Sequence, residues 1–141
     1  MNLYSSLCFV PPSNFTQNPI AFDSSHFYFA ENITSHSITF YSVPLQNLSG
    51  GSWLTPPVCP IVKIVEIKGD SLLLMKSNGQ VLVGVVLSDQ DFVLFTFNLK
   101  TAQFNSTILT AFDPSFPFDF DPNLDYLVYA STNGAIQSFY R

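Results

Sequence analysis

Short apolar runs separated by polar turns recur along nearly the whole chain. The runs are rich in Val, Ile, Phe, Tyr and Thr, and Gly, Pro, Asn, Asp and Ser interrupt them. No stretch has the i, i+3, i+4, i+7 apolar spacing of an amphipathic helix. This pattern is typical of β-strands. It predicts twelve strands, at residues 3–10, 19–23, 26–31, 37–43, 61–68, 71–76, 80–87, 92–99, 104–110, 116–120, 125–131 and 135–140.

The alternation within a run indicates how its strand is buried. In "DFVLFTFNLK" (residues 91–100), apolar side chains recur at every second position. Since successive side chains of a strand point to opposite faces, one face is expected to carry Val93, Phe95, Phe97 and Leu99.

The run "VLVGVVL" (residues 81–87) is apolar on both faces, which predicts a strand covered on both sides. Gly84 within it indicates a bulge or a close neighbour. The run is also the segment most prone to aggregate when exposed. A charge at Val83 is expected to reduce that tendency in the unfolded chain and to damage the fold.

Two Asn-Gly pairs mark hairpins, in "SNGQ" (residues 77–80) and "TNGA" (residues 132–135). Asn and Gly tolerate positive φ, which a type I′ turn requires at both central residues. The sequence therefore predicts type I′ turns at both places.

The strand pattern of residues 18–43 returns at residues 116–140, and a weaker copy lies between them. Phe40, Phe95 and Phe139 are aligned as equivalents, at separations of 55 and 44 residues. The alternative alignment matches the two Asn-Gly turns and shifts the middle copy by about one strand. Repeats of this length with several short strands are typical of β-propellers.

The segments "FDPNLDYLVYASTNGAIQSFY" (residues 120–140) and "FNLKTAQFNST" (residues 97–107) resemble blades of the WD40/NHL/quinoprotein-like propeller superfamily. The resemblance implies an all-β domain of antiparallel four-stranded blades, an open or partial propeller. The expected blades are 19–68, 71–110, and 116–140 completed by strand 3–10. Propellers usually have four to eight blades, so the chain is expected to be a fragment, an open stack or half of a dimeric ring. The alternative fold is a β-sandwich or another barrel. The resemblance carries over no functional residue.

Composition narrows the classes of partner. The 141 residues are 47% hydrophobic and 11% charged, which excludes a mainly disordered chain. The formal net charge is −5, and the five Lys and Arg are scattered. Because phosphate backbones and anionic membranes require clustered cations, neither nucleic-acid binding nor a polybasic membrane contact is expected.

The chain has no visible targeting or membrane-spanning segment. The longest apolar run is far below the roughly 18 residues that span a bilayer, and the N-terminus lacks a basic region before its apolar stretch. We expect a cytoplasmic protein by default, or a secreted one if the true start lies upstream. Cys8 and Cys59 are expected to be small buried hydrophobes, or one bridge in an oxidising compartment.

Candidate metal ligands are few. His26 and His36 are expected at a strand start and in a loop, without the ligand set of a zinc site. Four aspartates lie close together, and we interpret them as turn formers with a weak cation site as the alternative: Asp113, Asp119, Asp121 and Asp125. No metal or cofactor is predicted.

Catalytic motifs are also lacking. Glu31 and Glu66 are the only glutamates, and nothing in the sequence marks them as a paired acid and base. No Gly-x-Ser-x-Gly elbow, Walker A or dinucleotide-binding glycine pattern occurs. We do not expect an enzyme.

Four N-glycosylation sequons begin at Asn14, Asn32, Asn47 and Asn105, in a composition that would produce some by chance. Trp53 is the only tryptophan; it is expected either to pack under its loop or to contact a partner.

The sequence thus favours a non-catalytic binding module with a protein or glycan partner. The alternative is part of a propeller enzyme, a hydrolase or a quinoprotein-like oxidoreductase, whose active site lies in other blades. Open blade edges would also favour homo-oligomers.

Overall fold

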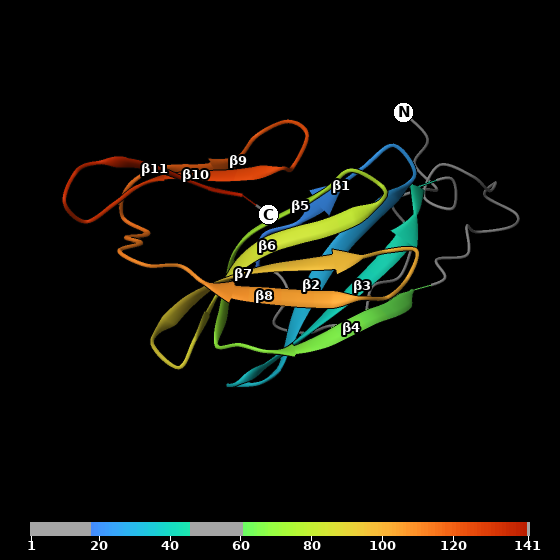
Figure 1. Cartoon of the computed structure of the whole chain (residues 1–141). Coiled ribbons are helices and arrows are strands. Elements are labelled where there is room, and N and C mark those ends of the chain that lie inside the picture. Colours follow the sequence, from blue (N-terminus) through green and yellow to red (C-terminus); the bar gives the residue numbers. More distant parts are fainter. Residues whose placement is uncertain (1–17, 46–60, 141) are drawn as a thin grey trace, which may run out of the picture.

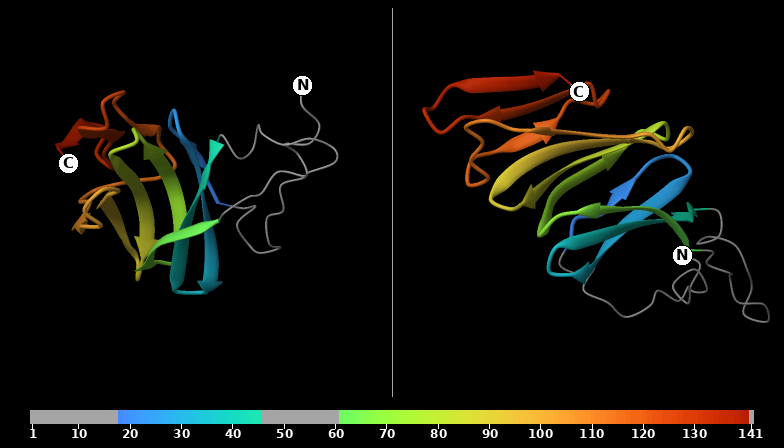
Figure 2. Two further views of the ribbon diagram at one scale, coloured as in Figure 1. Left: turned by 90° about the vertical axis from the view of Figure 1, so that its right-hand side faces the viewer. Right: turned by 60° about the horizontal axis from the view of Figure 1, so that its bottom comes forward.

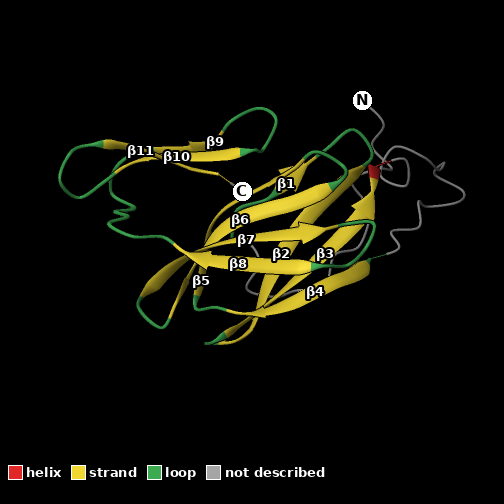
Figure 3. Cartoon of the chain, viewed as in Figure 1, coloured by secondary structure: helices red, strands yellow, loops and turns green. Residues whose placement is uncertain are grey.

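The structure, a computed structural model, describes residues 18–45 and 61–140, and most of this ribbon is strand (Figures 1 and 3). The fold is all-β. Within these ranges the strands are β1 (Ala21–Phe22), β2 (His26–Thr34), β3 (Ser37–Pro44), β4 (Val62–Lys68), β5 (Ser71–Ser77), β6 (Val81–Ser88), β7 (Asp91–Asn98), β8 (Phe104–Ile108), β9 (Phe118–Phe120), β10 (Tyr126–Ala130) and β11 (Ile136–Tyr140). Each coincides with a strand predicted from the sequence. The twelfth prediction, 3–10, lies outside the described residues.

The strands form three open antiparallel sheets, each made of strands consecutive in the sequence. The first sheet has the order β1-β2-β3-β4, the second β5-β6-β7-β8, and the third β9-β10-β11. Short turns connect most neighbours because each short apolar run ends at a turn signal, whereas the connection from β3 to β4 lies mostly outside the described residues. The predicted division into blades stays a prediction, and so does its single domain.

The sheets are stacked face to face, with the second sheet in the middle (Figure 2). One apolar cluster joins the first and second sheets and includes Tyr28, Phe40 and Phe95. Another joins the second and third sheets and includes Val83, Leu127 and Tyr129. The core is therefore divided into two apolar layers, and the second sheet contributes to both.

Strand β6 is buried from both sides, as predicted. Leu82 and Val86 lie in the cluster with the first sheet, and Val83 and Val85 lie in the cluster with the third. All four side chains are at most 1% exposed. This explains why "VLVGVVL" lacks the alternation of a half-exposed strand.

The predicted alternation of β7 is also confirmed. Val93, Phe95, Phe97 and Leu99 all lie in or against the cluster with the first sheet. Leu94 faces the third sheet.

The equivalence of Phe40 and Phe95 is not supported. They lie on the third strand of their sheets, yet their rings face each other across the interface, with centroids 5.2 Å apart. In a stack where each sheet repeats its neighbour, equivalent side chains would point the same way. Because their rings face each other, Phe40 and Phe95 lie on opposite faces of their sheets. Side-chain direction reverses at every residue of a strand, so the alignment that equates them is out of register.

Gly84 occupies a place where a side chain does not fit, as predicted. A Cβ there would lie 2.5 Å from the Leu74 carbonyl oxygen and 2.6 Å from the Phe95 ring. Phe95 is the cross-strand partner of Gly84. The glycine thus allows the ring of Phe95 to lie over the strand.

The hairpins at the two Asn-Gly pairs form, but the prediction of type I′ turns is wrong. Gly79 and Gly134 have φ of 89° and 86°, whereas Asn78 and Asn133 keep negative φ. The connections are longer than two residues, since the paired strand residues nearest them are Ser77 and Leu82, and Ala130 and Ile136. Each Asn instead uses its side-chain oxygen to accept backbone N–H groups.

A two-residue turn with positive φ at both central positions occurs elsewhere, between β6 and β7. Asp89 and Gln90 have φ of 49° and 72°, and Ser88 pairs with Asp91. Neither residue is glycine, so sequence alone did not indicate this turn.

Within the described ranges, no helix has the length and apolar character needed to cross a membrane.

Candidate functional site

The densest polar network joins the first and second sheets at Asp23, in the turn between β1 and β2. Its Oδ2 accepts hydrogen bonds from the Tyr28 hydroxyl at 2.6 Å and from Ser77 Oγ at 2.8 Å. Its Oδ1 accepts the backbone N–H groups of Ser25 and His26, each at 2.8 Å. The Asp-Ser-Ser turn places these donors around one carboxylate, as Asp commonly does in turns.

These contacts determine the ionisation of the network. Burial by itself raises the pKa of Asp23, but the hydrogen bonds from Tyr28, the Ser25 N–H, Ser77 and the His26 N–H outweigh it and hold that pKa at about 2. Burial and the bond to Asp23 raise the pKa of Tyr28 to about 12. At neutral pH the pair is therefore a carboxylate and a neutral phenol.

Ser25, His26 and Asp23 have the residue types of a catalytic triad but not its geometry. Ser25 Oγ lies 2.8 Å from His26 Nδ1 and 3.0 Å from Asp23 Oδ1. In a triad the acid must bond the other imidazole nitrogen to orient the base. Here Asp23 bonds the serine and the backbone N–H of His26, so the arrangement stabilises a turn.

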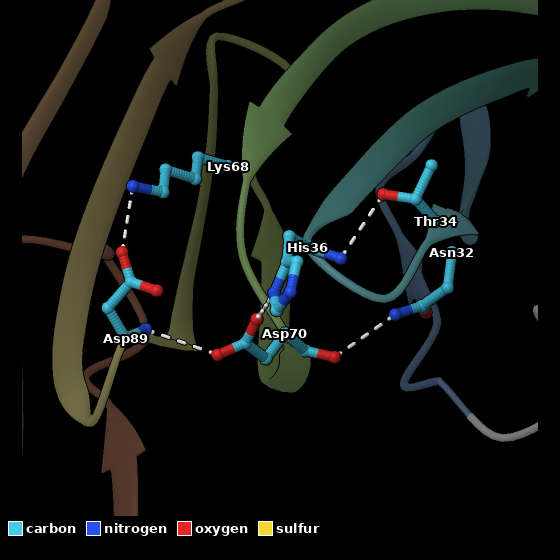
Figure 4. Close-up of polar contacts among 6 residues, drawn as sticks. All are labelled: Asn32, Thr34, His36, Lys68, Asp70 and Asp89. Atoms are coloured by element: carbon cyan, nitrogen blue, oxygen red, sulfur yellow. Dashed lines mark hydrogen bonds and ion pairs between the residues drawn. The ribbon is translucent and has the colours of Figure 1, made fainter.

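A second polar group gathers residues that are distant in sequence (Figure 4). His36 follows β2, Asp70 follows β4, and Asp89 follows β6. His36 Nδ1 lies 2.6 Å from Asp70 Oδ1, and the Asp89 N–H donates to Asp70 Oδ2 at 3.1 Å. Lys68 Nζ lies 2.7 Å from Asp89 Oδ2. Asp70 thus links a turn of the first sheet to a turn of the second.

His36, Asp70 and Asp89 are the one group of potential metal ligands within the described part of the chain. Their ligand atoms lie within 4.8 Å of one another. The bond from His36 lowers the pKa of Asp70, and the Asp89 N–H adds to this effect. Both oxygens of Asp70 already accept hydrogen bonds, and the Lys68 ammonium compensates Asp89. The geometry supports an exposed link between sheets. The sequence did not indicate this group, because residues 34 and 19 positions apart leave no local signal.

The aspartates at residues 113–125 are only partly turn formers. Asp113 Oδ1 accepts the N–H and hydroxyl of Ser115. Asp121 Oδ1 accepts the N–H groups of Asp125 and Tyr126, each at 2.7 Å. For Asp119 the prediction is wrong: it lies in β9 and pairs with Lys76 of the second sheet at 3.8 Å.

The two glutamates are brought together by the strand register. Glu31 and Glu66 are the partners of Thr39 on opposite sides of β3. Burial of Tyr41 raises its pKa, and the negative charges of Glu31 and Glu66 raise it further. Lys63 lies 3.5 Å from Glu66. Neither glutamate is marked as a catalytic acid by this arrangement.

The sequons that can be placed differ in their surroundings. The side-chain N–H of Asn32 donates to the Asp70 carbonyl at 3.1 Å, and its Oδ1 accepts a bond from Asn18. Asn105 is exposed on β8. Three of the residues singled out from the sequence lie outside the described ranges, as do both cysteines: Asn14, Asn47, Trp53, Cys8 and Cys59. His26 is half-buried and His36 is exposed.

The outward face of the third sheet has exposed apolar side chains beside Asp119 and Ser138. Leu127 and Tyr129 point to the second sheet, so the alternate residues Val128 and Ala130 point away from it. Ile136 pairs with Ala130 and lies on the same outward side. Val128 is 40% exposed and Ile136 is 75% exposed. These residues and Asp119 line a groove of about 610 Å³.

Two smaller hollows lie between the first and second sheets, along β4. One, of about 380 Å³, is lined by Ile64, Phe97 and Lys100 among others. The other, of about 420 Å³, is lined by Ile67, Phe104 and Ser106 among others. Apolar side chains form the larger part of each lining, and polar and charged side chains form the rest.

In comparisons with known proteins, neither a family model nor a curated protein matches this chain. Its function is therefore inferred from its own sequence and geometry.

Proposed function

We propose that this protein is a non-catalytic interaction module of β-propeller type. In this proposal its three sheets are blades, and the outward face of the third sheet contacts a second copy of the chain. The observation that carries the proposal is this outward face, on which Val128 and Ile136 are exposed. Exposed apolar side chains gathered on one face are a common sign of an association site.

The arrangement of the first strands supports the propeller type. Strand β1 lies beside β5, and Ser77 at the end of β5 bonds Asp23 at the end of β1. Lys76 of β5 pairs with Asp119 of β9. The first strands of successive sheets thus follow one another along one side of the stack, as inner blade strands do.

The stacking also supports a second copy as the occupant. The second sheet is covered by an apolar sheet on each side. The outward face of the third sheet, with Val128 and Ile136, suits another sheet of this kind. The same face of a second copy provides one and allows a closed two-fold contact.

The non-catalytic part of the proposal rests on the polar groups described above. The carboxylate at Asp23 orients a turn, and Asp70 links two sheets. No specific observation favours the alternative of an enzyme fragment, which stays a prediction from sequence. A glycan or another protein as partner also stays a prediction.

Site-specific photo-cross-linking tests the proposed contact. A benzophenone amino acid replaces Ile136 on the outward face or, as the control, Ile108 on β8, which is 55% exposed. We expect illumination to give a covalent dimer, twice the 15.7 kDa monomer mass, from position 136 and not from 108. Equal cross-linking at both positions, or none at 136, would contradict the proposal.

A further inference from the structure

Strands β4 and β8 are the last strands of the first and second sheets, and within the described residues each is an edge. Phe104 and Ile108 of β8 pair with Phe97 and Val93, so they lie on the face that points to the first sheet. They nevertheless remain 39% and 55% exposed. The contact between the two sheets therefore opens toward β4 and β8.

This opening is elongated along β4. The hollow of about 380 Å³ is lined by Val62 and Ile64 from the first half of β4, and the hollow of about 420 Å³ by Val65 and Ile67 from the second half. A strand rises about 3.3 Å per residue, so a ligand covering both halves would be extended. We call the two hollows together the inter-sheet groove.

The floor and edge of the inter-sheet groove suit an extended chain. The Phe104 ring stacks on Phe95, with centroids 6.2 Å apart. In the described ranges, β8 pairs on one side only, with β7. An open strand edge beside apolar hollows is the arrangement in which a peptide adds as a further strand and places alternate side chains in pockets.

Charge gives the inter-sheet groove a direction. Two of the five cationic residues of this acidic chain line it, Lys68 and Lys100. Lys68 pairs with Asp89. Lys100 lines the smaller hollow and has no ion pair within the part of the chain that the structure describes. A carboxylate of a ligand is therefore favoured at the Lys100 end, because Lys68 at the other end is already paired.

From this geometry we infer that the inter-sheet groove binds an extended apolar peptide segment, with a carboxylate at its Lys100 end. The peptide main chain pairs with the edge of β8, and alternate apolar side chains enter the two hollows. The site is separate from the outward face of the third sheet.

The probe is a displayed library of random dodecapeptides, selected on the full chain. The affinities of enriched peptides are measured by fluorescence anisotropy for the wild type and four variants. Lys100→Glu and Phe104→Ser alter the inter-sheet groove. Lys76→Glu makes the same charge change on β5, and Ile136→Ser makes an apolar-to-polar change on the third sheet.

We expect enriched peptides to alternate apolar residues and to end in an acidic group. Lys100→Glu should weaken their binding about five- to tenfold at low salt, and added salt should reduce this effect, as for an exposed charge pair. Phe104→Ser should abolish measurable binding, and the two control variants should bind as the wild type does.

The inference is overturned if no peptide is enriched, if both groove variants bind normally, or if Ile136→Ser alone removes binding. Thermal melts check each variant for folding. Lys100 is exposed, so Lys100→Glu carries the test even where Phe104→Ser fails to fold.

Discussion

At the scale of single residues, Asp23 has the largest effect on how the first two sheets are joined. One carboxylate accepts hydrogen bonds from Tyr28 of the first sheet and Ser77 of the second. Tyr28 is only 2% exposed, so removing Asp23 takes away the acceptor of a buried hydroxyl.

We therefore expect Asp23→Ala to lower the free energy of unfolding by about 1–2 kcal/mol at neutral pH, allowing for solvent screening at a partly exposed carboxylate. The control is Asp91→Ala, an exposed residue at the start of β7, with an expected change within about 0.5 kcal/mol. Urea denaturation of both variants checks this. Equal effects would contradict the network.

The pH dependence follows from the pKa of Asp23, which falls from 3.8 to about 2 on folding. Because the folded pKa is the lower one, the ionised carboxylate stabilises the fold above about pH 4, and this contribution is lost as the pH falls to about 2. Urea denaturation between pH 6 and pH 2 should therefore show the difference between wild type and Asp23→Ala shrinking across that window. A constant difference would indicate that charge plays no part.

Gly84 provides a second test at this scale. Gly84→Ala places a methyl group against Phe95 and the Leu74 carbonyl, and overpacking of this kind costs about 1–3 kcal/mol. Thermal unfolding measures the change, with Ser106→Ala on the exposed strand β8 as the control. A Gly84→Ala variant as stable as wild type would mean that the ring does not lie over this strand.

At the scale of elements, β6 determines the layered arrangement, since its side chains enter both apolar clusters. Val83 is 0% exposed between the second and third sheets. The free energy needed to bury an unpaired charge is larger than the free energy of unfolding of most domains.

Val83→Asp should therefore destabilise the protein by more than about 4 kcal/mol and prevent folding, as judged by circular dichroism. Val62→Asp, on an exposed position of β4, is the matched control and should fold. Val83→Ala, a milder change, should fold with a loss of about 2 kcal/mol. Unchanged stability of Val83→Asp would show that β6 is not covered on both sides.

The elements were predictable where local patterns decide them. The apolar runs predicted the eleven strands, and the run at 81–87, which is apolar on both faces, predicted the buried strand β6. The geometry of the two Asn-Gly turns was not predictable. In them Asn78 and Asn133 accept backbone hydrogen bonds through their side chains, and only the glycines have positive φ. The partners of His36 and of Glu31 were also invisible, since strand register and sheet stacking bring them together.

At the scale of the whole molecule, the two ends of the stack are not alike. Phe29 and Val43 on the outward side of the first sheet are each 2% exposed, whereas Val128 and Ile136 on the third sheet are 40% and 75% exposed. The sequence predicted open blade surfaces in general. The arrangement of the sheets shows which apolar side chains stay exposed: Val128 and Ile136 on the third sheet, and Phe22, at 57%, on the first.

Sedimentation equilibrium of the chain over a range of concentrations tests the central claim most directly. We predict reversible association of the 15.7 kDa chain into dimers, and a shift toward monomer in Ile136→Lys but not in Ile108→Lys. A wild-type protein that remains a monomer at every concentration would contradict the claim that the outward face of the third sheet is a contact between copies.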